Sequence, residues 1–275
     1  MAGSDDARGD QRPAGATQGG SPDGERLQKV LSRAGVASRR RVESFIQQGR
    51  IRVNGDIVDE LGTRVDVARD VVTLNGKALQ LDIDRRYLLF HKPTKMVTSL
   101  VDDKGRSDLS GILDEVGERV YPVGRLDYDS SGLLILTNDG DAANILAHPS
   151  FGVEKTYVVS VSGAVSNKTL GELTRGVELE DGVSFADSAQ RVGDPRGGKS
   201  LLEITLHSGK NRIVRRMCAA VGHEVLTLQR RKFGPFHLGG LRPGQWREFT
   251  ADERHQLATL VELAKGSRIP PGGTQ

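Results

Sequence analysis

Apolar residues between positions 26 and 49 recur at helical spacing and predict two short helices. The first helix should end at Gly35, because glycine readily takes the left-handed conformation that closes many helices. The second should begin after Ser38, a residue type that caps helix N-termini, and end at Gly49. The apolar positions with this spacing are Leu27, Val30, Leu31, Ala34, Val42, Phe45 and Ile46.

Two Asn-Gly pairs downstream of these helices predict tight β-hairpin turns. Residues 51–58 alternate in polarity on either side of Asn54-Gly55, and the apolar run 71–74 leads into Asn75-Gly76. A helix pair and a few short strands would form a small folding unit, and we place its limits at residues 24–82.

From residue 83 the pattern alternates between strands and helices and predicts a second, larger α+β domain, residues 83–265. It has no steady strand-helix-strand rhythm, which favours a largely antiparallel mixed sheet. The expected strands are 87–90, 133–137, 156–161 and 201–206, and the expected helices are 141–147, 170–175 and 214–221. Residues 1–23 contain no Leu, Ile, Val or aromatic residue and are expected to be a disordered leader, and 266–275 a flexible tail.

The composition excludes several classes of protein. The apolar runs are far shorter than the roughly 20 residues of a membrane helix, and the N-terminus lacks a signal-peptide core. We therefore expect a cytoplasmic protein with no membrane partner, and we expect it to be a monomer. Cys218 is the single cysteine, so the chain can form neither an internal disulfide nor a thiolate metal cage, and its apolar surroundings predict core packing.

The net charge of +3 is small, but positive charge is concentrated in two segments. Residues 24–50 contain seven Lys and Arg against two Glu, a net +5, and residues 196–232 contain nine against two Glu, a net +7. Two separate basic segments suggest a polyanion such as RNA bound at two places. A solvated helix face is the alternative explanation for either segment alone.

The segment from Arg26 to Gly55 reads RLQKVLSRAGVASRRRVESFIQQGRIRVNG and closely resembles the S4 RNA-binding domain. The resemblance covers most of the predicted N-terminal unit. It implies that Arg39, Arg40 and Arg41, which follow the serine cap and face outward, contact RNA backbone. A purely solubilising role for these arginines stays open.

Residues 124–132, GRLDYDSSG, are the segment best suited to chemistry, and a calcium loop is one interpretation of it. Four positions of an EF-hand pattern, one, three, five and six, are filled by fitting residue types: Asp127, Asp129, Ser131 and Gly132. Position twelve, however, is Asn138 instead of a bidentate glutamate. Residues 133–137 also read as a strand, so the pattern disfavours calcium.

The second interpretation rests on a family resemblance. Residues 124–140, GRLDYDSSGLLILTNDG, resemble the catalytic-loop signature of one family of ribosomal RNA pseudouridine synthases, whose A type modifies small-subunit RNA and whose B type modifies large-subunit RNA. Residues 155–157, KTY, resemble the K-x-Y motif of that family, and residues 209–217, GKNRIVRRM, resemble its third motif. Val225-x-x-Leu228-x-Arg230 continues the third motif, so the resemblance covers residues 87 to about 250.

The resemblance implies a role for three side chains. Asp127 would be the catalytic nucleophile or base, Arg215 the cation that keeps it ionised, and Tyr157 the flat ring that faces the uracil. Isomerisation breaks the bond between uracil N1 and ribose C1′ and rejoins the base through C5, so one carboxylate can serve, without metal or cofactor. Burial alone would neutralise a carboxylate, which is why a cation must lie close by. For Tyr157, a half-buried strand tyrosine without a role stays open.

A uridine inside folded RNA must be extruded to reach such a pocket, and a side chain must fill the space that it leaves. Arg125, adjacent to Asp127, is expected to do this. The other RNA contacts expected in this domain are Lys210, Arg212 and Arg230. Several possible metal ligands lack ligand spacing, and surface or cap roles are expected for them: His91, His148, His207, His223 and Asp139.

Two positions depart from the family pattern without touching a catalytic one. Ile213 stands where glutamine is more frequent, and Lys95 stands where glycine follows Lys-Pro-x. The expected function is site-specific conversion of uridine to pseudouridine in ribosomal RNA, most similar to the B type that modifies 23S rRNA near the peptidyl-transferase centre, free or in a pre-ribosomal particle. A small-subunit rRNA synthase and a catalytically silent ribosome-binding or assembly factor are the alternatives.

Overall fold

Residues 23–100 and 102–266 are described by a computed structural model, in which the chain divides into two compact units, Met1–Asp84 and Arg85–Gln275. Each unit has its own hydrophobic core. The expected leader and tail lie outside the described residues, apart from Asp23, which lies in a turn, and Gly266, which ends a helix and so does not belong to a tail. No helix in the described part of the chain is long and apolar enough to span a membrane.

The N-terminal unit contains the two predicted helices, α1 (Leu27–Arg33) and α2 (Arg39–Gln47). The Ser38 hydroxyl accepts a hydrogen bond from the Arg41 N–H at 3.3 Å, which is the cap expected from the sequence. The apolar sides of both helices are buried in one core, and the three arginines that open α2 are exposed.

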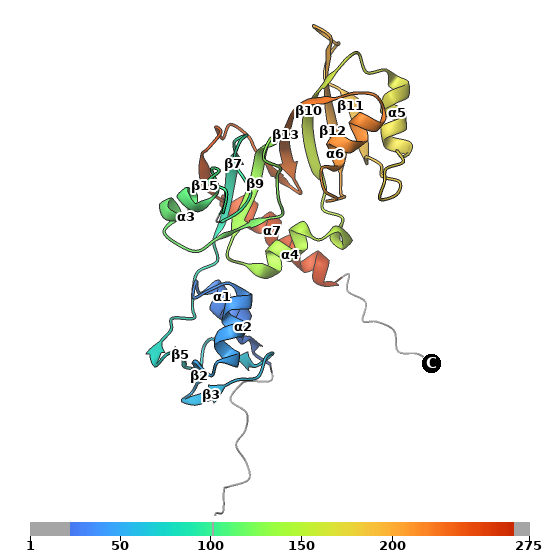
Figure 1. The fold of residues 1–275 in the computed structure, drawn as a ribbon. Coiled ribbons are helices and arrows are strands. Elements are labelled where there is room, and N and C mark those ends of the chain that lie inside the picture. Colours follow the sequence, from blue (N-terminus) through green and yellow to red (C-terminus); the bar gives the residue numbers. More distant parts are fainter. Residues whose placement is uncertain (1–22, 101, 267–275) are drawn as a thin grey trace, which may run out of the picture. The chain divides into compact units, whose positions relative to one another are not determined.

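Two small sheets complete this unit (Figure 1). Both Asn-Gly pairs have positive φ at both residues, as a type I′ turn requires, so the predicted hairpins are confirmed. One sheet pairs β1 (Glu25–Arg26) with β4 (Arg64–Val65). The other has the order β3-β2-β5-β6, with β2 (Ile51–Val53), β3 (Asp56–Val58), β5 (Val72–Leu74) and β6 (Lys77–Ala78).

The C-terminal unit is built on one nine-stranded sheet, which confirms the predicted α+β class with a largely antiparallel mixed sheet. The central order is β11-β12-β10-β13-β9-β7-β15, and β14 and β8 attach to β13 and β9. The strands are β7 (Tyr87–Lys92), β8 (Tyr121–Val123), β9 (Ser131–Thr137), β10 (Lys155–Ser162), β11 (Ser188–Arg191), β12 (Lys199–Leu206), β13 (Val225–Phe233), β14 (Phe236–His237) and β15 (Trp246–Glu248).

Helices cover the two halves of this sheet (Figure 1). In one half, α5 (Asn167–Arg175) and α6 (Ile213–Ala220) share a core with β10, β12 and β13. In the other, α4 (Gly140–Ala147), a 3₁₀ turn (Pro149–Phe151) and α7 (Ala251–Gly266) pack on one face, and α3 (Ser110–Val116) packs on the opposite face. Strands β7 and β9 are therefore buried on both faces, which explains their nearly continuous apolar sequence.

A parallel pair, β13 with β9, joins the two halves of the sheet. In this pair Arg230 lies opposite Gly132, which has a φ of +113°. A Cβ at Gly132 would lie 2.3 Å from the Arg230 carbonyl oxygen, so only glycine permits the close approach. The approach holds the loop that precedes β9, residues 124–130, against β13.

Candidate active site

The loop of residues 124–130 joins β8 to β9 and presents Asp127. The Thr98 hydroxyl donates to the Leu126 carbonyl at 2.7 Å and accepts from the Leu126 N–H at 3.1 Å. The Lys95 N–H donates to the Tyr128 carbonyl at 2.7 Å, and the Leu126 side chain is buried in the core beneath. The loop is thus fixed on both sides of Asp127, while the Asp127 side chain keeps 28% of its surface exposed.

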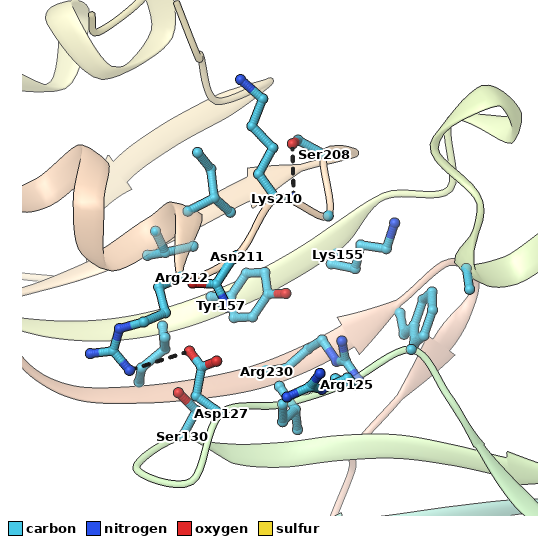
Figure 2. Close-up of a pocket in the computed structure, with 18 residues that line it drawn as sticks. Arg125, Asp127, Ser130, Lys155, Tyr157, Ser208, Lys210, Asn211, Arg212 and Arg230 are labelled. Carbon is cyan, nitrogen blue, oxygen red and sulfur yellow. Dashed lines mark hydrogen bonds and ion pairs between the residues drawn. The ribbon is translucent and has the colours of Figure 1, made fainter. Parts of the chain in front are cut away.

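Asp127 lies where two pockets meet. One pocket, of about 370 Å³, also contains Tyr157 and the loop of residues 208–214 (Figure 2). The second, of about 400 Å³, is bounded by residues 97–99 and shares Arg125, Asp127 and Arg212 with the first. The first volume lies within the range of small-ligand sites, so a single nucleotide can be held next to the Asp127 carboxylate.

Arg212 lies beside the Asp127 carboxylate, with Nη1 3.8 Å from Oδ2 (Figure 2). Arg215 instead lies 3.3 Å from Asp129 Oδ2 and donates to the Asp129 carbonyl at 3.1 Å. This differs from the expected pairing of Arg215 with Asp127. The other end of the Arg215 guanidinium donates to the Val225 carbonyl at 3.3 Å, and this contact aims the group at Asp129.

The two arginines favour the ionised form of Asp129. Burial raises the pKa of Asp129, but the charge of Arg215 and a hydrogen bond from Arg212 outweigh burial and hold that pKa below its ordinary value. Arg212 also has a φ of +49°, a left-handed conformation that a residue with a side chain adopts at an energetic cost. Such local strain is frequent at functional sites and here places the Arg212 side chain over both aspartates.

Tyr157 enters the pocket from β10, where it pairs with Ile204 of β12 and Arg230 of β13. Its ring is half-buried and contacts the hydrophobic cores of both halves of the nine-stranded sheet. Figure 2 shows the ring in the same pocket as the Asp127 carboxylate. The exposed part of the ring is available to a planar base.

The four RNA contacts expected in this domain all line the same pocket. Arg125 is exposed at its edge, and Arg212 pairs with the two aspartates. Lys210 points away from Asp127 and donates from Nζ to the Asp181 carbonyl at 3.1 Å (Figure 2). Arg230 is only 3% exposed, so it belongs to the interior of the pocket and not to the outer surface.

The structure contradicts the calcium interpretation. Ser131 and Gly132 begin strand β9 and do not lie in a loop, and Asp129 is held by two arginines. Among the residues that the structure describes, no three His, Cys, Asp or Glu side chains are arranged to hold a metal ion.

The remaining candidate ligands have ordinary contacts. Asp139 caps α4, His148 caps the 3₁₀ turn, His207 lies 2.8 Å from Asp187, and the His223 ring pairs with the Ser162 carbonyl. His91 differs from the expected surface or cap role, because it is buried against Leu241. Burial raises the pKa of Cys218 to about 12, and this cysteine packs in the core as predicted.

The two departures from the family pattern have structural correlates. Lys95 has a φ of +62°, and glycine is the residue that takes this conformation without strain. Ile213 is 6% exposed at the start of α6, where it belongs to the core as well as to the pocket wall.

Two buried lysines near the site were not expected from the sequence. Lys92 is fully buried and donates to the Pro93 and Met96 carbonyls at 2.8 and 2.7 Å, beneath the segment that anchors the 124–130 loop. Lys155 is 5% exposed and lines the pocket. The sequence did contain a signal that Lys155 faces the pocket. Lys155 and Tyr157 are two residues apart on one strand, and such residues share a face.

Comparison with known proteins extends this description. Residues 86–220 match the family of RNA pseudouridylate synthases, and residues 25–77 match the S4 domain. The chain is 42% identical over 244 residues to the ribosomal large subunit pseudouridine synthase B of Bacillus subtilis, covering 88% of this chain and 99% of that protein. The protein of the same name from Yersinia pestis is 40% identical, covering 87% and 77%. A crystal structure of a pseudouridylate synthase superposes with a TM-score of 0.59 at 26% identity, covering 85% of this chain and 99% of the other.

Proposed function

Because the chain belongs to the RNA pseudouridylate synthase family, we propose that it converts one uridine of large-subunit (23S) ribosomal RNA, near the peptidyl-transferase centre, to pseudouridine. The observation that supports this proposal most strongly is the position of Asp127, held on a fixed loop beside Tyr157 in a pocket of nucleotide size. The names of the Bacillus and Yersinia relatives support the choice of large-subunit RNA.

Asp127 would act on the ribose of the extruded uridine. Either its carboxylate adds to C1′ as the N1–C1′ bond breaks, or it removes the C2′ proton to give a glycal. In both routes the uracil turns within the pocket and C5 bonds to C1′; this bond displaces the Asp127 carboxylate in the first route, and C2′ regains its proton in the second. N1 takes up a proton, and the proton on C5 is lost. Tyr157 would support the ring during the turn, and its hydroxyl would lie near that proton. The reaction is an isomerisation and consumes neither water nor an oxidant.

The arginines around the loop would divide the remaining tasks. Arg212 would balance the charge of Asp127, and Arg215 would hold the loop through Asp129. Arg125, exposed at the pocket edge, would take the place of the extruded base in the RNA.

The S4 unit would supply affinity for RNA. Its α2 carries Arg39, Arg40 and Arg41 on an exposed surface, where each can neutralise a phosphate. We propose an rRNA partner, free or within a pre-ribosomal particle, a monomeric enzyme and a cytoplasmic location, with residues 24–82 and 83–265 acting as RNA-docking and catalytic domains.

Purified full-length protein tests this proposal when it is incubated with transcripts of 23S and 16S rRNA that lack pseudouridine. Base-specific chemical labelling and primer extension then locate any product. Conversion of one uridine in the 23S transcript is expected. Conversion in the 16S transcript alone would favour the small-subunit rRNA alternative, and binding without conversion of either RNA would favour an assembly factor.

A further inference from the structure

Two buried cations lie on neighbouring strands of the pocket. Lys155 of β10 is 5% exposed, and Arg230 of β13 is 3% exposed. Both line the pocket that contains Asp127 and Tyr157 (Figure 2). Arg230 is the cross-strand neighbour of Tyr157, and Lys155 shares the face of Tyr157 on β10, so all three side chains meet the same space.

The protein satisfies these two cations only in part. Lys155 Nζ donates to the His207 carbonyl at 3.1 Å, and Arg230 Nε donates to the Leu133 carbonyl at 2.8 Å. Both cations also contact the Phe233 ring, at 5.4 and 4.7 Å from its centroid. Within residues 23–100 and 102–266, neither cation has a carboxylate within 4.0 Å, and Arg230 Nη2 is buried without a hydrogen-bond partner.

Such an arrangement is costly without a bound anion. A buried charge normally has an opposite charge or a full set of hydrogen bonds, because water no longer solvates it. Burial, together with the charge of Arg230, lowers the pKa of Lys155 to about 8, although Asp187 acts in the opposite direction. The pocket thus contains two positive charges that a ligand, and not the protein, would neutralise.

The neighbours of the pair identify the kind of anion. Tyr157 offers its ring to a planar base, and Asp127 lies where the ribose carbon of the same nucleotide would react. A nucleotide that places its base and ribose on these two residues brings its own phosphate into the same pocket. The uracil carbonyls are neutral and would leave both positive charges unbalanced.

We propose that Lys155 and Arg230 form a phosphate subsite, which binds the phosphate of the nucleotide whose base lies against Tyr157. The inference rests on the proposed function for the identity of that base. The subsite differs from the exposed arginines of α2, because it acts only on a nucleotide already inside the pocket. Its contribution is to fix the nucleotide along the axis between Tyr157 and Asp127.

A binding experiment with mononucleotides tests the subsite without requiring turnover. Uridine, 5′-UMP, 3′-UMP and inorganic phosphate are titrated separately into ¹⁵N-labelled full-length protein, and NMR chemical shifts give each Kd. One of the two monophosphates should bind about tenfold or more tightly than uridine, as expected for a charge-assisted contact. The tighter isomer shows which phosphate the pair binds.

Three variants assign the difference to the proposed pair. Lys155→Met should reduce the advantage of the monophosphate to within about twofold of uridine, and Lys155→Arg should restore most of it. Arg231→Met is the matched control, because Arg231 is exposed on the same strand as Arg230 and lies outside the pocket. It should keep the full advantage. Lys155→Met should also melt at the same or a higher temperature than wild type, since it removes a buried charge.

Equal affinity for uridine and both monophosphates would overturn the proposal, as would equal losses in Lys155→Met and Arg231→Met. Inorganic phosphate that binds as tightly as the better nucleotide would also overturn it, because the site would then take an anion without recognising a nucleotide. Conversion of rRNA with no phosphate effect would leave the proposed function intact and remove the subsite. A monophosphate advantage that is lost in Lys155→Met, without conversion of rRNA, would support the subsite and contradict the proposed function.

Discussion

The arginines of α2 and two arginines of the C-terminal unit, Arg215 and Arg230, carry the same charge in opposite surroundings. Arg39, Arg40 and Arg41 are exposed, whereas the Arg215 side chain is 13% exposed and Arg230 is 3% exposed. Exposed charges attract RNA from a distance and are screened by salt. Buried charges act on the one group that they touch, and that action is stronger because water is absent. This difference supports the proposal that affinity for RNA and chemistry belong to different regions of the chain.

The largest effect within this comparison is expected from Arg215→Met. The change removes the hydrogen bond from Arg215 to the Asp129 carbonyl, worth on the order of 1.5–3 kcal/mol, and the ion pair with the Asp129 carboxylate. Turnover at saturating RNA should therefore fall by about a hundredfold or more, because the loop that carries Asp127 loses an anchor. Arg216→Met is the control, since Arg216 follows directly in α6 but pairs with Asp181. Comparable loss of turnover in both variants would argue against a specific role for Arg215.

The pH profile of the same variant sharpens the prediction. The pKa of Asp129 is held below its ordinary value in the folded protein, so its pairing stabilises the loop above the ordinary pKa and is lost as pH falls through the lowered one. Removing Arg215 should raise the pKa of Asp129, which moves the acid limb of activity to higher pH. A profile of turnover between pH 4 and 8 checks this, and an acid limb unchanged in Arg215→Met would contradict it.

A smaller effect, confined to affinity, is expected in the N-terminal unit. Replacing Arg39, Arg40 and Arg41 together by alanine should weaken rRNA binding about tenfold or more and flatten the plot of log Kd against log salt by roughly two to three units. Turnover at saturating RNA should stay near the wild-type value. Arg69→Ala removes one exposed charge from the segment between β4 and β5 of the same unit and should leave the salt slope nearly unchanged. A triple variant with wild-type affinity and slope would break the comparison.

The smallest effect is expected at Lys95, an exposed lysine that belongs to neither group of cations. Its left-handed backbone costs about 1–2 kcal/mol, and glycine removes that strain while adding about 0.5–1 kcal/mol of unfolded-state entropy. Lys95→Gly should therefore stabilise the folded state by roughly 0.5–1 kcal/mol, measured by denaturant unfolding. Lys95→Ala retains the strain and serves as the control. Destabilisation by the glycine variant would show that the lysine side chain makes a stabilising contact.

Local elements of the fold were predictable from the sequence, because their signals are local. Asn54-Gly55 and Asn75-Gly76 adopt the turns that these residue types favour, and Ser38 caps α2. The helix α7 (Ala251–Gly266) was missed, since Leu257 is its only buried residue and its apolar stripe is weak. The parallel pairing of β13 with β9 was also missed, because it joins segments about a hundred residues apart and depends on the glycine that permits the approach.

The site also combines features that local sequence patterns predict with features that depend on distant segments of the chain. Asp127 and Tyr157 were identified from motifs, and the structure brings both into one pocket. The partner of Arg215 was not predictable from the sequence. The choice between Asp127 and Asp129 depends on the turn between them and on the hydrogen bond from Arg215 to the Val225 carbonyl. The burial of Lys155 depends on β12 and β13, which flank β10, and no local pattern reports that environment.

The central claim is that the Asp127 carboxylate performs the reaction, and Asp127→Asn tests it most directly. The substitution keeps the shape of the side chain and removes its charge, so it can neither add to C1′ nor accept the C2′ proton. Conversion of uridine in the 23S transcript should disappear while rRNA binding persists, because no contact with phosphate is removed. Asp129→Asn is the matched control, and it should lower the rate but leave product detectable, since its role is to hold Arg212 and Arg215. Appreciable conversion by Asp127→Asn would contradict the account.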